Sequence, residues 1–133
     1  MKPEYSKEDL IKHRLQKADE TLYEAKSIAK KQFLRAAMNS IYYACYYAAT
    51  AILLKEDIKP KTHKGVREML GLHFVKTGKI TFESGRFYSD AFDSRHSSDY
   101  EDFFVLNEKT ITEFLLRAEL FIDEIKAIYK EHE

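Results

Sequence analysis

Residues 32–54 read QFLRAAMNSIYYACYYAATAILL, and this stretch decides the fold. Its apolar residues recur every three or four positions, which is the period of one face of an α-helix. That face carries Phe33, Ala37, Ile41, Ala44, Ala48 and Ile52. A second group widens the apolar arc and consists of Tyr42, Tyr43, Tyr46 and Tyr47. The sequence therefore predicts a helix from about Gln32 to Leu54 that lies at the centre of a bundle or also faces a partner.

The first and last parts of the chain have the same helical period. Ser6 and Asp9 have the spacing of a capping box and predict a helix from about Lys7 to Lys30. Asn107 can cap a long last helix. The apolar face of that last helix consists of Ile111, Phe114, Leu115, Ala118, Phe121, Ile122, Ile125 and Ile128.

Two shorter helices are expected between these long ones. One runs from about His63 to Val75 and ends at a turn that Gly78 favours. The other can be capped by Thr81. Strand alternation is absent, and no linker or repeat divides the chain. We therefore predict an all-α, antiparallel up-and-down bundle of about five helices, three long and two shorter, forming a single domain over residues 1–133.

Composition and charge limit the functions that the chain can have. The 133 residues are 44% hydrophobic, and 22 basic residues balance 22 acidic ones, so a strongly cationic nucleic-acid coat is excluded. Basic residues dominate positions 55–79 and acidic residues positions 83–113. Such a dipolar surface suits self-association or a complementary protein at least as well as RNA.

Several other properties are expected to be absent. No apolar run approaches the roughly 20 residues that cross a bilayer, and we expect a cytoplasmic protein without a membrane contact. Cys45 lies in an apolar stretch and is expected to be a buried, inert thiol. Because His13, His73 and His132 have no ligand spacing, we predict no metal. We also expect no cofactor.

The most informative polar segment is Arg95-His96-Ser97-Ser98-Asp99-Tyr100-Glu101-Asp102, into which the fourth helix is expected to break near its end. Tyr88, Phe92 and Arg95 share one helical face, of which two members are core-type residues. A guanidinium keeps its charge at ordinary pH. It must therefore reach water, pair with an acid or serve an anionic ligand.

Taken together, three segments resemble the small stand-alone HEPN domains (higher eukaryotes and prokaryotes nucleotide-binding) of bacteria and archaea. They are residues 33–49, the run Lys61-Thr62-His63-Lys64-Gly65-Val66, and Arg95 with Asp99-Tyr100. The resemblance covers about residues 7–130. It implies a helical bundle that commonly dimerises. It also implies a frequent partner, a minimal nucleotidyltransferase encoded nearby as a toxin–antitoxin or substrate-binding pair.

The same resemblance implies a ribonuclease motif that this chain completes only in part. Active members are metal-independent ribonucleases with an arginine, four to six residues, and a histidine. Arg95 fits the arginine, but Tyr100 stands five places later and His96 is adjacent. Cleavage needs a group that titrates near neutrality, which a histidine supplies and a tyrosine with a reference pKa of ~10 does not. In some pairs the partner transfers a nucleotide to a tyrosine beside this motif, and Tyr100 is a candidate acceptor.

Two histidines could replace the missing one, and each also has a structural interpretation. One helical step rotates His96 by about 100° from the Arg95 face, which favours an exposed residue at a helix end. His63 lies near a helix start where free backbone N–H groups, with Thr62 and Lys64, could hold an anion. The alternative there is a capping turn, with Gly65 allowing close packing.

Arg95 and the tyrosines also have structural alternatives. If the fourth helix continues, Asp99 can form an i,i+4 pair with Arg95, and Tyr100 can cover that pair. Such a cluster would brace the turn without any chemistry. We expect the tyrosines of the second helix to line the core and a dimer face. A base-stacking platform usually has interleaved basic residues.

Three functions follow, and we favour the first. It is a homodimeric nucleotide- or RNA-binding module that pairs with a minimal nucleotidyltransferase and is not catalytic alone. Its candidate binding residues are Arg95, Asp99, Tyr100, Thr62, His63 and Lys64. The second is a metal-independent ribonuclease toxin whose candidate catalytic residues are Arg95 with His96 or Tyr100. The third is a purely structural bundle. We expect the dimer because the second helix carries more apolar surface than one small bundle easily hides.

Overall fold

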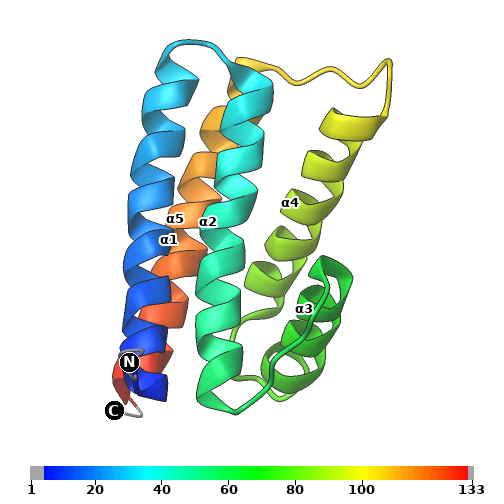
Figure 1. Cartoon of the computed structure of the whole chain (residues 1–133). Helices are drawn as coiled ribbons and strands as arrows, with labels where there is room; N and C mark the ends of the chain where they lie inside the picture. The colour runs from blue at the N-terminus through cyan, green and yellow to red at the C-terminus, as the bar shows by residue number, and fades with distance from the viewer. Residues whose placement is uncertain (1–4, 132–133) are drawn as a thin grey trace.

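The computed structural model describes residues 5–131, and its elements are helices throughout, with no strand in that range. They are α1 (Lys7–Lys30), α2 (Leu34–Lys55), α3 (His63–Leu70), the π-helical turn η1 (Gly71–Val75), α4 (Phe82–Tyr100) and α5 (Glu108–Glu131) (Figure 1). The prediction of an all-α bundle with three long and two shorter helices is confirmed. His132, one of the histidines considered for a metal, lies outside the described residues.

Helix α2 is the centre of the bundle, as its sequence predicts. It packs against α1, α3, α4 and α5, so that helices surround it on several sides (Figure 1). Tyr42 is fully buried, while Tyr43, Tyr46 and Tyr47 are half-buried. No large apolar side chain of α2 is exposed. Much of the apolar surface of α2 is therefore covered within the chain, and Tyr43, Tyr46 and Tyr47 keep part of their surface exposed.

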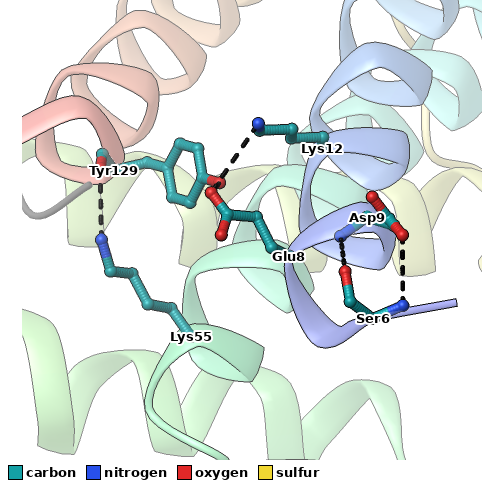
Figure 2. A network of polar contacts seen from close by, with 6 residues as sticks. All are labelled: Ser6, Glu8, Asp9, Lys12, Lys55 and Tyr129. Atoms are coloured by element: carbon teal, nitrogen blue, oxygen red, sulfur yellow. Dashed lines mark hydrogen bonds and ion pairs between the residues drawn. The ribbon is translucent and has the colours of Figure 1, made fainter.

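The two described ends of the chain meet at one end of the bundle. The capping box is confirmed, because the Asp9 amide donates to Ser6 Oγ at 3.0 Å and the Ser6 amide to Asp9 Oδ2 at 3.2 Å. Figure 2 shows the network next to it, in which the Tyr129 hydroxyl donates to Glu8 Oε1 at 3.0 Å. Lys55 Nζ donates to the Tyr129 carbonyl oxygen at 3.2 Å. These contacts tie α1, α2 and α5 together.

The predicted caps of the other helices are also present. Thr81 Oγ1 accepts from the Ser84 amide at 3.1 Å, and Asn107 Oδ1 accepts from the Thr110 amide at 2.8 Å. Gly78 has a φ of 77°, a conformation that glycine adopts without steric cost. The turn that it was expected to form therefore exists.

Two helix ends differ from the sequence-based expectation. The third helix does not continue as one α-helix to Val75, because a π-helical turn begins at Gly71 and the Lys76 amide bonds to the Gly71 carbonyl at 2.9 Å. The fourth helix does not break at Arg95 but runs to Tyr100. No glycine or proline interrupts residues 86–100, so nothing stops the helix earlier. No helix within residues 5–131 is long and apolar enough to cross a membrane.

Candidate functional site

Arg95 extends from α4 toward the tyrosine side of α2. Its guanidinium carbon lies 5.4 Å from the centre of the Tyr42 ring and 5.6 Å from that of Tyr43. Cations at such distances are attracted by the ring quadrupole. Only 20% of the side chain is exposed to solvent. Arg95 therefore stays within the contact between α2 and α4, with only a small part of its side chain in water.

The polar atoms of Arg95 are incompletely satisfied. Nε lies 3.4 Å from Asp99 Oδ2, one helical turn on, which confirms the predicted i,i+4 pair. The geometry is too poor for a hydrogen bond, and Nε is buried without a hydrogen-bond partner among residues 5–131. A buried donor without a partner costs about 1–3 kcal/mol. Asp99 therefore leaves the Arg95 guanidinium only partly satisfied.

His63, at the start of α3, lies in the same cluster. Its Nδ1 is 2.8 Å from the Tyr42 hydroxyl, and its ring lies 4.5 Å from that of Tyr46 and 5.6 Å from that of Tyr43, centre to centre. Burial lowers the pKa of His63, and the positive charge of Arg95 lowers it further. The imidazole is therefore neutral near pH 7. The structure thus brings together two segments, around residues 63 and 95, that the sequence could only treat separately.

The hydroxyls behind this histidine are uncharged. Burial raises the pKa of Tyr42 to about 12, although Tyr88 and the charge of Arg95 oppose the shift. Burial, with Tyr42 beside it, also raises the pKa of Tyr88 well above 10. The Tyr42 hydroxyl can donate to His63 Nδ1 or accept from it, depending on the tautomer. It thereby fixes the orientation of the imidazole, and the other ring nitrogen can act as donor or acceptor.

Thr62, Lys64 and Gly65 have different places around His63. Thr62 Oγ1 accepts from the Gly65 amide at 2.9 Å and so caps α3. A Cβ atom on Gly65 would lie 2.9 Å from that oxygen and 3.3 Å from Pro60 Cβ. The capping turn with a closely packed glycine is thus what the structure contains. Lys64, the next residue after His63, is exposed to solvent.

His96 and Tyr100 form a separate pair on the exposed part of α4. Their ring centres are 4.8 Å apart, and Tyr100 is 68% exposed. Within residues 5–131, neither forms a hydrogen bond or ring contact with Arg95 or Asp99. The expectation that Tyr100 covers the Arg95–Asp99 pair therefore finds no contact to support it.

Two features of this site were missed by reasoning from the sequence. The rings that hold Arg95 and His63 together are those of Tyr42 and Tyr43, which had been assigned to the core or to a dimer face. Arg67 on α3 lies over the Phe92 ring, 4.3 Å from its centre, at the edge of the same cluster. The sequence signal that could have indicated this contact is the adjacent pair Tyr42 and Tyr43 together with the single arginine, Arg95, in the apolar face of the fourth helix. No group of three or more metal-ligating side chains occurs in the part of the chain that the structure describes.

Comparison with known proteins assigns this bundle to a family. The model of the HEPN domain matches residues 11–128. The chain is 34% identical over 125 residues to a UPF0332 protein of Thermotoga maritima, which covers 94% of this chain and 95% of that protein. It is 35% identical over 114 residues, 86% of this chain and 84% of the relative, to a Methanocaldococcus jannaschii protein named "Putative toxin MJ0605". A second protein of that organism, named "Putative toxin MJ0142", is 27% identical over 112 residues, 84% of this chain and 76% of that protein.

The chain therefore belongs to the HEPN domain family, as its three segments indicated. Relatives of nearly the same length are small proteins of bacteria and archaea, and two of them carry a toxin name. A role of the toxin–antitoxin or nucleotide-binding type fits this membership.

Proposed function

We propose that this chain acts as a single HEPN domain that binds nucleotide or RNA at the Arg95–His63 cluster, as a homodimer and as the partner of a minimal nucleotidyltransferase. The observation that carries the proposal is the state of Arg95. It is a mostly buried cation on two tyrosine rings, with one poorly aligned carboxylate contact and an unsatisfied Nε.

The surroundings of Arg95 suit a phosphate. A phosphate oxygen would accept from the guanidinium in good geometry, which the Asp99 carboxylate does not achieve. His63 is neutral and can donate from one ring nitrogen without repelling Arg95. The Arg95 charge is not neutralised by burial, because a guanidinium stays protonated. The cluster therefore favours an anion over a neutral ligand.

The test compares Arg95 with a matched arginine elsewhere. Arg117 on α5 also pairs with an aspartate, at 3.2 Å from Asp90, and also lies over an aromatic ring, 4.7 Å from the centre of Phe87. We expect Arg95→Ala to weaken AMP binding at least about tenfold, as expected for a charge-assisted contact, and Arg117→Ala to leave it unchanged. Isothermal titration calorimetry measures both. Equal affinities of the two variants would contradict the proposal.

The partner and the dimer rest on the family resemblance and on exposed apolar surface. The α4–α5 connection carries Phe103, which is 96% exposed, and Val105, which is 82% exposed. Such surface is typical of an interface. An adjacent gene for a small nucleotidyltransferase, whose product copurifies with this chain, would support the pair. Sedimentation that shows only monomer at micromolar concentration would contradict the dimer.

Tyr100 is exposed enough to accept a nucleotide, and mass spectrometry after incubation with that partner and ATP would detect the adduct.

A second candidate function, a metal-independent ribonuclease, is favoured by one specific observation. His63 shares two tyrosine rings with Arg95, so the cluster contains the histidine that the Arg95 segment lacks. A neutral imidazole can take the proton of a ribose 2′-hydroxyl, whose oxygen then bonds to phosphorus as the P–O5′ bond breaks. The guanidinium can stabilise the phosphate charge, and the leaving 5′-oxygen takes its proton from the imidazolium or from water. RNA cleavage in EDTA that His63→Ala abolishes and His96→Ala leaves intact would support this function. Absence of cleavage by the unchanged protein would exclude it.

A further inference from the structure

We infer that the Arg95–His63 cluster is the middle of a longer track for single-stranded RNA, which crosses α2 from Lys17 on α1 to Arg67 on α3. This inference rests on the proposed function, because it extends the same site and names its ligand class. We use the term aromatic ridge for six rings on this side of the molecule: Tyr47, Tyr46, Tyr43, His63, Tyr42 and Phe92.

The aromatic ridge is continuous from one end to the other. Tyr47 lies 6.0 Å from Tyr46, and Tyr46 lies 4.5 Å from His63, measured between ring centres. His63 lies 5.6 Å from Tyr42, which in turn lies 6.0 Å from Phe92. All of these rings except Tyr42 keep part of their surface exposed. The exposed parts of the other five rings can contact bases without regard to their sequence, because every base has a π face, and the buried Tyr42 ring supports them from within.

A cation lies over each end of the aromatic ridge and over its middle. Lys17 Nζ is 4.6 Å from the centre of the Tyr47 ring, and Arg67 is 4.3 Å from that of Phe92. Arg95 lies between them, over Tyr42 and Tyr43. The three cations come from three different helices. The interleaved basic residues of a base-stacking surface are therefore present, although the sequence of α2 alone does not contain them.

The acidic groups near the aromatic ridge leave the cations only partly neutralised. Asp99 pairs with Arg95 and Asp93 with Arg67, each at 3.4 Å. Lys17 forms no ion pair among residues 5–131. Helical spacing places Glu24 on the same edge of α1, two turns beyond Lys17, where it would limit the track on that side. Lys17 is therefore the cation of the track without an ion pair in the described residues, while Arg67 and Arg95 each have one carboxylate at 3.4 Å.

The length of the aromatic ridge selects the kind of ligand. It crosses from α1 over α2 to α3 and α4, which Figure 1 shows side by side. Two interhelical spacings of about 8–10 Å make this roughly 20 Å. One nucleotide would occupy only the middle, so the full row of cations matches several consecutive phosphates of a strand. Duplex RNA has its bases stacked inside and could not use the rings.

The experiment compares ligand lengths and matched variants. UMP and an oligouridylate of about eight nucleotides, within the usual site size of single-strand binders, are titrated by isothermal titration calorimetry and fluorescence anisotropy, respectively. The variants are Lys17→Ala, Arg67→Ala, Arg95→Ala and Tyr47→Leu. Lys109→Ala is the control, because Lys109 is an exposed lysine at the start of α5 and its loss changes the net charge equally. Circular dichroism shows that each variant is folded.

We expect the oligouridylate to bind more tightly than UMP. Lys17→Ala and Arg67→Ala should each weaken oligouridylate binding about three- to tenfold and lower the slope of log affinity against log salt by about 0.7. Neither should change UMP binding, whereas Arg95→Ala should weaken both ligands. Lys109→Ala should match the unchanged protein.

Three results would overturn the track. The first two leave the proposed function standing, and the third removes it as well. If UMP binds through Arg95 but Lys17→Ala and Arg67→Ala behave like Lys109→Ala, the track is wrong and the proposed function stands. If Lys17→Ala and Tyr47→Leu instead change the sedimentation of the protein without affecting RNA binding, the aromatic ridge is an interface with a second copy. If neither ligand binds, the track and the proposed function both fail.

Discussion

The two halves of α4, residues 82–91 and 92–100, differ in how they contact the rest of the bundle. In the first half, Phe87, Tyr88 and Ala91 are buried, and Glu124 of α5 accepts from the Thr81 amide at 2.6 Å and from Ser84 Oγ at 2.5 Å. After Ala91 no residue of α4 is buried. The second half instead carries two i,i+4 pairs, the half-buried Arg95 with Asp99 and the exposed His96 with Tyr100.

This difference separates stability from function along a single helix. The first half buries Phe87, Tyr88 and Ala91 and is joined to α5 through Glu124, which is the arrangement of a structural element, although the Tyr88 hydroxyl has no hydrogen-bond partner among residues 5–131. The second half keeps an unsatisfied guanidinium beside a neutral histidine from another helix. A structure retains such groups at a site more often than in a core. Substitutions in the first half should therefore lower stability and leave binding unchanged. Substitutions in the second half should change binding and leave stability nearly unchanged.

The largest effect is expected from a matched pair of phenylalanines. Phe87 is 2% exposed and Phe103, just beyond the second half, is 96% exposed. Phe87→Ala should lower the free energy of unfolding by about 3–5 kcal/mol, because it leaves a cavity next to Phe114 and Phe121. Phe103→Ala should change it by less than about 0.5 kcal/mol. Urea denaturation of both variants measures the difference, and similar losses would contradict the comparison.

A smaller loss is expected where α4 begins. Glu124→Ala leaves the Thr81 amide and the Ser84 hydroxyl without their acceptor, which should cost about 1–3 kcal/mol. Glu119→Ala is the control, because Glu119 on the same helix has only a surface pair with Lys26 at 3.4 Å. Thermal unfolding followed by circular dichroism should show a lower melting temperature for the first variant alone.

His63 gives a still smaller effect that depends on pH. Its pKa is lower in the folded protein than the usual 6.5, so the unfolded chain binds a proton first as the pH falls. Stability is therefore lost as the pH drops from 6.5 through the lowered pKa. His63→Gln should remove this part of the acid destabilisation. Urea denaturation above and below pH 6.5 checks it; an unchanged pH dependence would show that His63 titrates normally.

The smallest change in stability is expected from Asp99, with a gain in binding. Asp99→Asn removes an i,i+4 ion pair, which contributes only about 0.3–0.5 kcal/mol. It also removes the negative charge that competes with a bound phosphate for Arg95. AMP binding should therefore become a few fold tighter in calorimetry. Weaker binding would mean that Asp99 orients Arg95 rather than competing with the ligand.

The sequence predicted most of the fold because the signals there are local. The capping side chains Ser6, Thr81 and Asn107 and the turn at Gly78 all occur where they were expected. The predicted end of α4 was wrong: a break was expected at the Arg95 segment, whereas the helix continues to Tyr100 and two i,i+4 pairs span its last turns. The π-helical turn of residues 71–75 has no local signal.

The candidate site could be predicted only in pieces. Arg95 and His63 were each singled out, but the contact between their segments passes through the side chains of Tyr42 and Tyr43 and needs the packing of α3 and α4 on α2. Reading α2 alone assigned its tyrosines to the core or to a dimer face. Lys17 and Arg67 belong to other helices, so their positions over the rings follow only from the fold.

The most direct test of the central claim measures binding and stability in one variant, Arg95→Ala. A binding role predicts that AMP affinity falls at least about tenfold, as for loss of a charge-assisted contact, while the free energy of unfolding changes by less than about 1 kcal/mol. Calorimetry and urea denaturation give the two values. A clear loss of stability with unchanged AMP affinity would contradict the claim and would mean that Arg95, Asp99 and the tyrosines only brace the bundle.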